Sequence, residues 1–299
     1  MLTVLVDGSN VGMASHFVGD KLTSPTGFHT GAIFGTLRTL SALIEKWAPV
    51  GTPVKFVVAW DCHRKDSWRR RLFAGYKANR DNQTPEEEEK SKQYYDQLPL
   101  LRQALSLLNV DQIRGDDLEA DDIAGMMWRQ VEVSDTNRLV LVSGDKDWLQ
   151  LVSHKTLIWQ PTKKRLVHPT TFDDCPEVHG AATPDQFLRM LAITGDSGDD
   201  VPGAFRVGPV TALKFLNGLL KPSSKAAQTI RDWIDNPDGF RRSMALVNLQ
   251  LPIIKPGRLA LTRASFDPAG FRSICTDLGF SSITDKFEEW CSTFERLKT

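Results

Sequence analysis

The sequence predicts an α/β fold built around a parallel sheet. Short apolar runs rich in valine and leucine, at residues 2–6, 54–60 and 139–142, are bounded by turn residues, as buried strands are. They alternate with runs whose apolar residues have helical spacing, such as 30–47, which ends shortly before Pro49. Strands that alternate with helices in this way are typical of a parallel sheet.

The remaining elements of the first half follow the same alternation. Thr84 and Pro85 predict the start of a long helix whose apolar positions run from Tyr94 to Leu108, with 86–89 as a solvated first turn. Residues 109–114 are expected to form a short strand and to be followed by a helix that ends near residue 131. Residues 148–152 predict a short helix, and 156–160 an edge strand.

A change of composition near residues 169–183, which are rich in Pro, Gly, Asp and Thr, predicts a boundary between two domains, 1–175 and 176–299. Helices are expected at 187–193 and 213–220, joined by a turn rich in glycine and proline. Such a pair of helices is suited to binding a phosphate backbone through amide groups. After residue 221 the sequence indicates no chemistry, and 267–279 predict a small helix packed on the core.

Composition limits the class of protein. The 299 residues contain 37 basic and 37 acidic side chains, which argues against a histone-like or polyacidic protein. The bases are nevertheless concentrated in 63–80, with a smaller group at 163–165. The four cysteines form no Cys-x-x-Cys pair, so neither a disulfide framework nor a zinc site is expected. With no signal peptide or membrane-spanning run, we expect a soluble cytoplasmic protein that is monomeric and not associated with membranes.

Acidic residues recur where the predicted strands end. One or two acids at a helix start would be explained by capping, but Glu119, Asp121 and Asp122 together repel one another unless cations lie between them. Because ligands bind at the carboxyl ends of strands in open α/β sheets, acids distant in sequence should meet at one edge. Oxygen ligands of this kind suit hard divalent ions such as magnesium. The acids outside the 115–122 stretch are Asp7, Asp61, Asp145, Asp147, Asp196 and Asp199.

Six motifs in order resemble those of the structure-specific 5′-nucleases, which include flap endonucleases, phage 5′–3′ exonucleases and the 5′-nuclease domain of bacterial DNA polymerase I. They cover roughly residues 2–220 and lie at 6–10, 60–80, 119–122, 144–151, 194–203 and 207–208. The resemblance implies a parallel α/β nuclease domain with a helical arch at about 63–95, and a helix–three-turn–helix DNA-binding region. It implies a 5′–3′ exonuclease or flap endonuclease of DNA replication and repair, in a bacterial or phage-infected cell.

The resemblance also implies a centre of two Mg²⁺ ions, with Mn²⁺ as a substitute. The first ion would be held mainly by Asp7, Asp61, Asp121 and Asp122, and the second would lie nearer Asp145, Asp147, Asp196 and Asp199. The full implied set is Asp7, Asp61, Glu119, Asp121, Asp122, Asp145, Asp147, Asp196 and Asp199. Two such ions can activate water and stabilise the leaving oxygen of an in-line phosphodiester displacement.

Substrate-binding residues are implied as well. Arg69, Lys77 and Arg80 would bind the scissile phosphate at the base of the arch, and Tyr76 would stack on a base of the frayed end unless it packs within the arch. A potassium ion would be bound by backbone carbonyls in the helix–turn–helix region. The implied potassium positions are Ile193, Thr194, Pro202, Ala204 and Val207, and the further DNA contacts are Arg70, Arg206, Gly208 and Lys214.

Two positions depart from the pattern of this family. Ala14 stands where many relatives carry an arginine, and Val210 where a lysine is usual, so Arg206 or Lys214 would supply the phosphate contact. The expected partner is DNA with a 5′ end, flap or nick. The alternatives are a 5′ nuclease directed at RNA or an RNA–DNA hybrid, a non-catalytic DNA-structure-binding protein, and a phosphatase built on the same sheet.

Overall fold

The computed structural model describes residues 1–251 and 259–297. Within these ranges the centre is a seven-stranded sheet in the order β6-β5-β4-β1-β2-β3-β7. The strands are β1 (Leu2–Asp7), β2 (Val54–Trp60), β3 (Asp111–Gly115), β4 (Arg138–Val142), β5 (Thr156–Gln160), β6 (Arg165–Val167) and β7 (Leu259–Thr262). Neighbouring strands from β5 to β3 are parallel, whereas β6 and β7 are antiparallel at the two edges. The predicted α/β sheet is confirmed.

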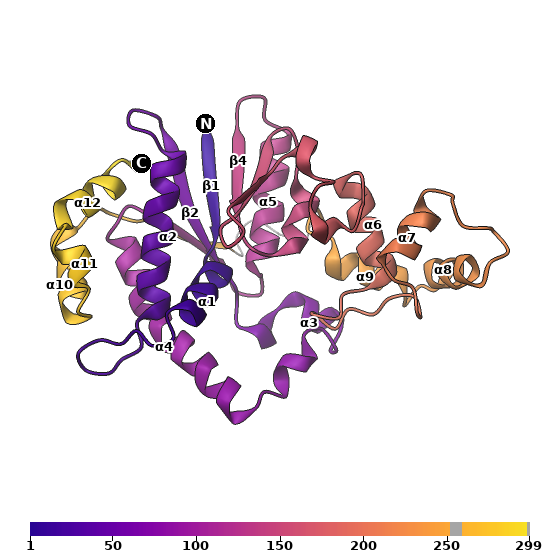
Figure 1. Cartoon of the computed structure of the whole chain (residues 1–299), viewed down its shortest axis with the longest axis horizontal. Helices are drawn as coiled ribbons and strands as arrows, with labels where there is room; N and C mark the ends of the chain where they lie inside the picture. Colours follow the sequence, from indigo (N-terminus) through magenta and orange to yellow (C-terminus); the bar gives the residue numbers. More distant parts are fainter. Residues whose placement is uncertain (252–258, 298–299) are drawn as a thin grey trace.

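Both faces of the sheet are covered, which explains why the central strands are apolar throughout. Val4 and Val6 face one core together with Leu37 and Leu101, while Leu5 faces a second core together with Ile123. This division follows from the alternation of side chains along a strand. The covering helices of the first half are α1 (Gly8–Val18), α2 (Gly31–Trp47), α4 (Pro85–Ser106) and α5 (Ala120–Glu132) (Figure 1).

One local prediction, the edge position of strand 156–160, was wrong. Before it in the chain, residues 8–10 form the first turn of α1, because Asp7 accepts a hydrogen bond from the Asn10 amide and so caps the helix. Gly8 is needed there because a Cβ would lie 2.6 Å from Cγ1 of Val58. Strand 156–160 is not at the edge of the sheet, since β6 pairs with its outer side. The sequence did not reveal β6 and β7, which are only 3 and 4 residues long.

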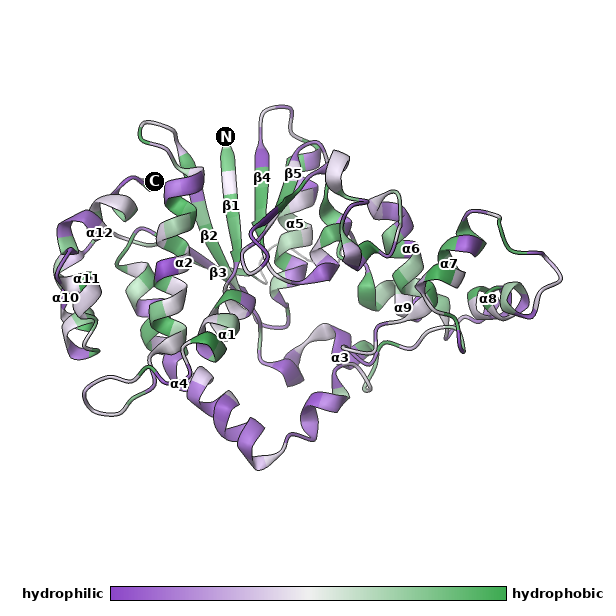
Figure 2. Ribbon diagram, in the orientation of Figure 1, coloured by the Kyte–Doolittle hydropathy of each residue, from purple (hydrophilic) through white to green (hydrophobic). Residues whose placement is uncertain are grey.

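The connection from β2 to α4 carries the basic stretch and lies beyond the carboxyl ends of the strands (Figure 1). It contains two short 3₁₀ helices, η1 (Arg64–Asp66) and η2 (Ala78–Asp81), with α3 (Trp68–Leu72) between them. The predicted start of α4 is confirmed, because Thr84 and Glu87 form a reciprocal capping box. Figure 2 shows that α3 and the first turns of α4 are hydrophilic, in contrast to the green strands.

The second half of the chain occupies both sides of the sheet (Figure 1). On one side lie α6 (Pro184–Thr194), α7 (Pro209–Leu216), α8 (Lys225–Asp235) and α9 (Phe240–Val247). The predicted helix 213–220 begins earlier, because Pro209 takes the first helical position, and it ends before Gly218, which has a φ of 69°.

The C-terminal residues return to the first half of the chain. After β7 has paired with β3, α10 (Pro268–Asp277), α11 (Ser281–Thr284) and α12 (Phe287–Glu295) pack on the side of α2. The small helix expected at 267–279 is confirmed as α10. A domain boundary near residue 175 stays a prediction. No helix in the described part of the chain combines the length and apolarity that crossing a membrane requires.

Candidate metal centre and phosphate-binding site

The ends of β1 and β4 fix two of the predicted acids. Asp7 ends β1, and its Oδ2 accepts a hydrogen bond of 2.9 Å from the Ser143 hydroxyl. Asp145 follows β4 and caps the 3₁₀ helix η3 (Lys146–Leu151) by accepting a hydrogen bond of 2.9 Å from the Asp147 amide. The Asn10 side chain joins the two loops, because its Oδ1 accepts from the Gly144 amide at 2.9 Å. Both carboxylates are therefore held by the loops that carry them.

Two further acids are oriented by the start of α5 and its neighbours. Asp61 follows β2, and its Oδ1 accepts a hydrogen bond of 2.7 Å from the Ala120 amide at the beginning of the helix. Asp121 lies in the first turn of α5 and accepts from the Trp148 indole at 2.7 Å. Amide and indole donors offset only part of the charge of each carboxylate, which leaves the second oxygen available to a ligand.

A cavity of about 480 Å³ lies where these elements meet. Its acidic wall combines residues from strand ends, the first turn of α5 and the loop after α6. The acids that line it are Asp7, Asp61, Asp121, Asp145 and Asp199. The structure thus brings together five of the nine acids that the sequence implied, although they span almost two hundred residues.

Burial and mutual repulsion raise the pKa values of three of the carboxyls. Burial, followed by the charges of Glu119 and Asp121, raises the pKa of Asp61 to about 6. Burial and Asp121 likewise raise the pKa of Asp145 to about 6, and burial with Asp61 raises that of Asp7 well above its usual range. Carboxyls whose ionisation is opposed in this way are typical of a site completed by cations.

The other four acids lie behind or beside the cavity. Glu119 and Asp122 are buried and pair with Arg69, at 3.4 Å and 2.9 Å. Asp196 pairs with Lys146 at 2.8 Å. Asp147 differs from these three, because its buried Oδ1 has no hydrogen-bond partner. An unpaired buried carboxylate oxygen is costly, and a cation would remove that cost.

The acids do not form a finished ligand set. Within residues 1–251 and 259–297, no three His, Cys, Asp or Glu side chains stand close enough together to hold a metal ion in the arrangement seen. The donor chemistry nevertheless fits a hard cation, because the acids around the cavity supply oxygen only. The open Oδ1 of Asp147 supports the same conclusion.

Lys77 and Arg80 meet the acids from the β2–α4 connection. Lys77 Nζ lies 3.0 Å from Glu119 and 3.6 Å from Asp199, and Arg80 lies 2.8 Å from Asp199. Burial opposes ionisation of Glu119, but the charges of Lys77 and Arg69 lower its pKa to about 2. Lys77 has a φ of 53°, a strained value for a residue with a side chain, so the surrounding contacts fix its position.

Two of the predicted substrate contacts are buried. Arg69 is 1% exposed, and it donates to the backbone oxygen of Leu246 as well as pairing with Asp122. Tyr76 is 3% exposed, and its hydroxyl donates to Glu119 at 2.9 Å. These contacts favour a packing role for both side chains, and their contacts with DNA stay predictions.

The other predicted DNA and potassium positions lie elsewhere. Arg70 pairs with Asp81 within the β2–α4 connection. Arg206, Gly208 and Lys214 are exposed at the connection of α6 with α7 and on α7 itself. Of the predicted potassium ligands, the carbonyls of Ile193, Pro202 and Ala204 each accept a hydrogen bond, from Ala204, Ser243 and Val207 respectively. The potassium site and these DNA contacts stay predictions.

Sequence reasoning missed several residues that line the cavity. They include Arg102 on α4 and Arg114 at the end of β3, together with Tyr94 and Tyr95. The rule that located the acids would have found Arg114, because it also lies near the carboxyl end of a parallel strand. Arg102 lies four residues after Leu98, which places a charged side chain next to the apolar face of the helix. That position was the sequence signal that could have pointed to Arg102.

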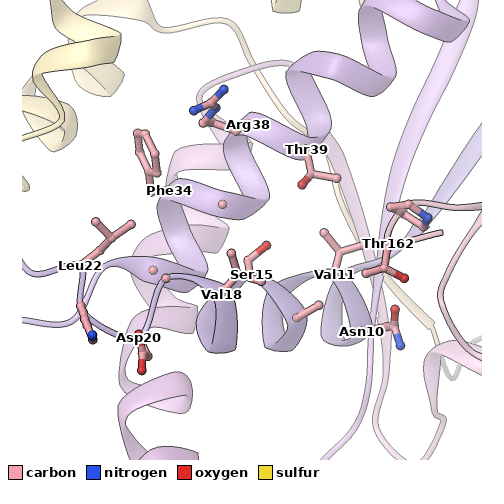
Figure 3. Close-up of a pocket in the computed structure, with 16 residues that line it drawn as sticks. Asn10, Val11, Ser15, Val18, Asp20, Leu22, Phe34, Arg38, Thr39 and Thr162 are labelled. Carbon is pink, nitrogen blue, oxygen red and sulfur yellow. The ribbon is translucent and has the colours of Figure 1, made fainter. Parts of the chain in front are cut away.

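A second cavity, of about 510 Å³, lies between α1 and α2 (Figure 3). Val11, Val18, Leu22 and Phe34 contribute apolar surface to its walls. Asn10 lines both cavities and lies at the end of this one that is near Thr162 (Figure 3). Because the second cavity has mainly apolar walls, the acidic cavity is the candidate for metal and phosphate chemistry.

Comparison with known proteins identifies the family. The model of the 5′-3′ exonuclease N-terminal resolvase-like domain matches residues 2–175. The chain belongs to this family. The resemblance inferred from the six motifs is confirmed, and the matched residues include the strands β1, β2, β3 and β4, together with the ends that carry Asp7, Asp61, Asp121 and Asp145.

Relatives within the 5′-3′ exonuclease family include both long and short proteins. DNA polymerase I of Lactococcus lactis subsp. cremoris is 34% identical over 76% of this chain, which corresponds to 25% of the polymerase. The 5′-3′ exonuclease of Buchnera aphidicola is 28% identical over 72% of this chain and 69% of its own. The chain therefore spans about a quarter of the length of that polymerase.

Solved structures share the fold. T5 5′-exonuclease with bound zinc ions aligns over 100% of both chains, with a TM-score of 0.68 and 19% identity. Flap endonuclease-1 from Methanococcus jannaschii aligns over 99% of this chain and 91% of its own, with a TM-score of 0.60 and 14% identity. At these identities the likeness concerns the fold alone.

Proposed function

We propose that the protein is a metal-dependent 5′–3′ exonuclease or flap endonuclease that hydrolyses phosphodiesters near the 5′ ends of DNA. The observation that carries the proposal is the cavity lined by Asp7, Asp61, Asp121, Asp145 and Asp199 at the carboxyl ends of parallel strands. Membership of the 5′-3′ exonuclease family supports it. So do the solved relatives, since T5 5′-exonuclease binds zinc and the T5 flap endonuclease forms a pseudo-enzyme-product complex with DNA and metal ions.

Within this proposal the acids of the cavity, with Asp147, would hold a pair of magnesium ions. Such a pair supplies an activated water and stabilises the leaving oxygen in phosphodiester hydrolysis. We infer that the carboxylates close together as cations bind, because mutual repulsion keeps them apart otherwise. Ser143 and Asn10 hold the two loops of β1 and β4 in register while this happens.

Lys77 and Arg80 would offset charge on the phosphate under attack. Both reach the acids from the β2–α4 connection, and Lys77 is only 12% exposed, so its charge acts in a poorly hydrated place. A phosphate that entered would replace Glu119 and Asp199 as the partner of these cations. The α6–α7 connection, with Arg206 and Lys214 exposed, would contact the duplex backbone, and its carbonyls would bind potassium.

The test is cleavage of 5′-labelled flap, nicked and blunt duplexes with magnesium, with and without EDTA. We expect cleavage of the flap, its loss in EDTA, and its loss in Asp121→Asn with binding of the flap retained. A change of Arg138 to Gln is a suitable control, because this arginine lies exposed at the opposite ends of the strands. Full cleavage by Asp121→Asn, or by the wild type in EDTA, would refute the proposal.

A further inference from the structure

The arginines of the basic stretch are already neutralised by carboxylates of the chain. Each of them has an acidic partner within ion-pair distance. These arginines are Arg64, Arg69, Arg70, Arg71 and Arg80. A phosphate can bind to such a group only in competition with its partner. In the sequence this basic stretch looked best suited to binding phosphate. In the fold its arginines are less available to phosphate than arginines without acidic partners.

Arg102 and Arg114 are in the opposite situation. Neither has a carboxylate within ion-pair distance anywhere in the part of the chain that the structure describes. The Nε of Arg102 is buried and has no hydrogen-bond partner. Burial and the nearby charge of Arg114 lower the pKa of Arg102, so the two cations destabilise each other in the protein alone. Arg114 is exposed, whereas Arg102 is half-buried, and a buried Nε without a partner among the described residues indicates that an anion is missing beside Arg102.

Arg102 is held in place by packing. Its guanidinium carbon lies 4.8 Å from the centre of the Trp60 ring, and the Trp60 indole donates to Gln112 at 2.9 Å. The Gln112 amide in turn donates to the backbone oxygen of Arg102 at 2.9 Å. Arg114 is exposed and lies beside Trp60 in the sheet, where β3 pairs with β2. The framework therefore fixes Arg102, and the sheet places Arg114 near it.

The two arginines line the same cavity as the acids. Asp61 is near enough for its charge to stabilise the Arg102 cation, yet the two do not form an ion pair. An anion bound in this cavity would have the arginines and the cation-binding acids in the same lining. Arginine is the side chain best suited to this task, because its planar fork binds two phosphate oxygens at once.

We propose that Arg102 and Arg114 bind a phosphate of the substrate strand, adjacent to the phosphate that is hydrolysed. This inference rests on the proposed nuclease function and adds a subsite to it. The phosphate is either a linkage of the strand or the terminal phosphate of its 5′ end, and both present the same oxygens. Tyr95, which is 59% exposed and lines the same cavity, would contact the attached nucleoside.

The experiment measures binding of a single-stranded 5′ flap to the full chain in EDTA over a range of salt concentrations. The variants are Arg102→Gln, Arg114→Gln and the double variant, with Arg138→Gln as the matched control. We expect each single variant to bind about tenfold less tightly and to reduce the slope of log K against log salt by roughly 0.7 to 1, whereas the control keeps the wild-type slope. Arg102→Lys should recover most of the slope, because it keeps the charge.

Flaps with a 5′-hydroxyl or with one neutral methylphosphonate linkage locate the phosphate. If the 5′-hydroxyl flap binds wild type and Arg102→Gln equally, the bound phosphate is the terminal one. If the methylphosphonate flap does so, the bound phosphate is the internal linkage that was made neutral. Wild-type slopes in Arg102→Gln and Arg114→Gln would overturn the inference. So would a loss that Arg102→Lys does not restore, since that would show a packing role on Trp60.

The two proposals fail in different ways. If the wild type cleaves flaps while both arginine variants bind like the wild type, only the subsite is refuted. If the wild type does not cleave but the variants lose salt dependence, the nuclease proposal fails and the phosphate site stands.

Discussion

At the scale of single residues, the site is a balance of charges that the side chains satisfy only in part. Lys77 lies between Glu119 and Asp199, and Lys146 pairs with Asp196, while Asp147 keeps an unpaired buried oxygen. The raised pKa values of Asp61 and Asp145 express the same imbalance. Functional sites commonly lower the stability of a protein, because function requires buried charges that are unfavourable for folding.

The pKa of Asp145 leads to a prediction about stability and pH. Below about pH 4 this carboxyl is protonated in both the folded and the unfolded chain. Between about pH 4 and 6 the unfolded chain loses the proton while the folded one keeps it, so the free energy of unfolding falls as the pH rises. Above about pH 6 the carboxyl is ionised in both states, and the full cost of burying its charge lowers the free energy of unfolding.

We therefore expect Asp145→Asn to be more stable than the wild type by roughly 1–3 kcal/mol at pH 8 in EDTA, and to show little difference near pH 4. The asparagine can still accept the hydrogen bond from the Asp147 amide. Urea unfolding at both pH values measures the effect. A variant less stable at pH 8 than the wild type would contradict the prediction.

Lys77 allows a second prediction at this scale. If its ammonium offsets charge on the phosphate under attack, Lys77→Met should lower kcat by roughly 100-fold or more and binding much less. Lys163→Met is the control, because Lys163 also forms an ion pair, with Glu177, but on the β5–β6 turn. Single-turnover cleavage and binding of the same flap separate the two effects, and equal losses in both would make Lys77 a simple electrostatic anchor.

At the scale of elements, the β2–α4 connection is fastened to the loop after α6. The Lys77 amide donates to the Asp199 backbone oxygen at 2.9 Å, and the Asn79 amide donates to the Asp200 carboxylate at 2.7 Å. The Arg80–Asp199 ion pair joins the same two segments. If a DNA strand passes between the connection and the acids, these contacts must accommodate it or break, so we expect them to affect access to the site.

Asp200→Gly tests the fastening without backbone strain, because Asp200 has a φ of 53°, which glycine adopts readily. We expect faster amide exchange in residues 77–81, measured by hydrogen–deuterium exchange, and little change in the central strands. His179→Gly is the matched control, since His179 has a φ of 54° in an exposed turn. Unchanged exchange in 77–81 would contradict the prediction and show that the contacts made by Asp199 alone hold this segment in place.

At the scale of the whole molecule, the C-terminal residues belong to the same packing as the N-terminal ones. Phe271 and Phe294 are fully buried in the core that also contains Leu37 and Leu101, and Thr293 donates to Glu45 at 2.9 Å. This core supports the face of the sheet on which α4, and with it Arg102, lies. The sequence after residue 221 indicated no chemistry, and its contribution is structural.

Phe294→Ala should therefore destabilise the entire molecule, by about 3–5 kcal/mol, in one cooperative transition. Leu219→Ala is the control, because Leu219 is 70% exposed. Circular dichroism and tryptophan fluorescence should report the same urea midpoint. Two separated transitions would instead show that α10–α12 unfold independently of the sheet.

The sequence by itself determined the parallel sheet and the acids at its strand ends. Both follow from local rules: apolar runs of strand length, and a topology in which the ends of parallel strands share one edge. The start of α4 was equally predictable, because its cap lies within four residues of sequence, from Thr84 to Glu87.

Only the tertiary structure decided which charged residues face the cavity. Arg69 is buried because Leu246, 177 residues away, supplies an acceptor and Asp122 a counter-ion. Tyr76 turns inward for a similar reason, whereas Arg102 and Arg114 have no acidic partner among residues 1–251 and 259–297. The physical reason is that burial and pairing depend on contacts between distant segments, which no pattern within a short stretch of sequence contains.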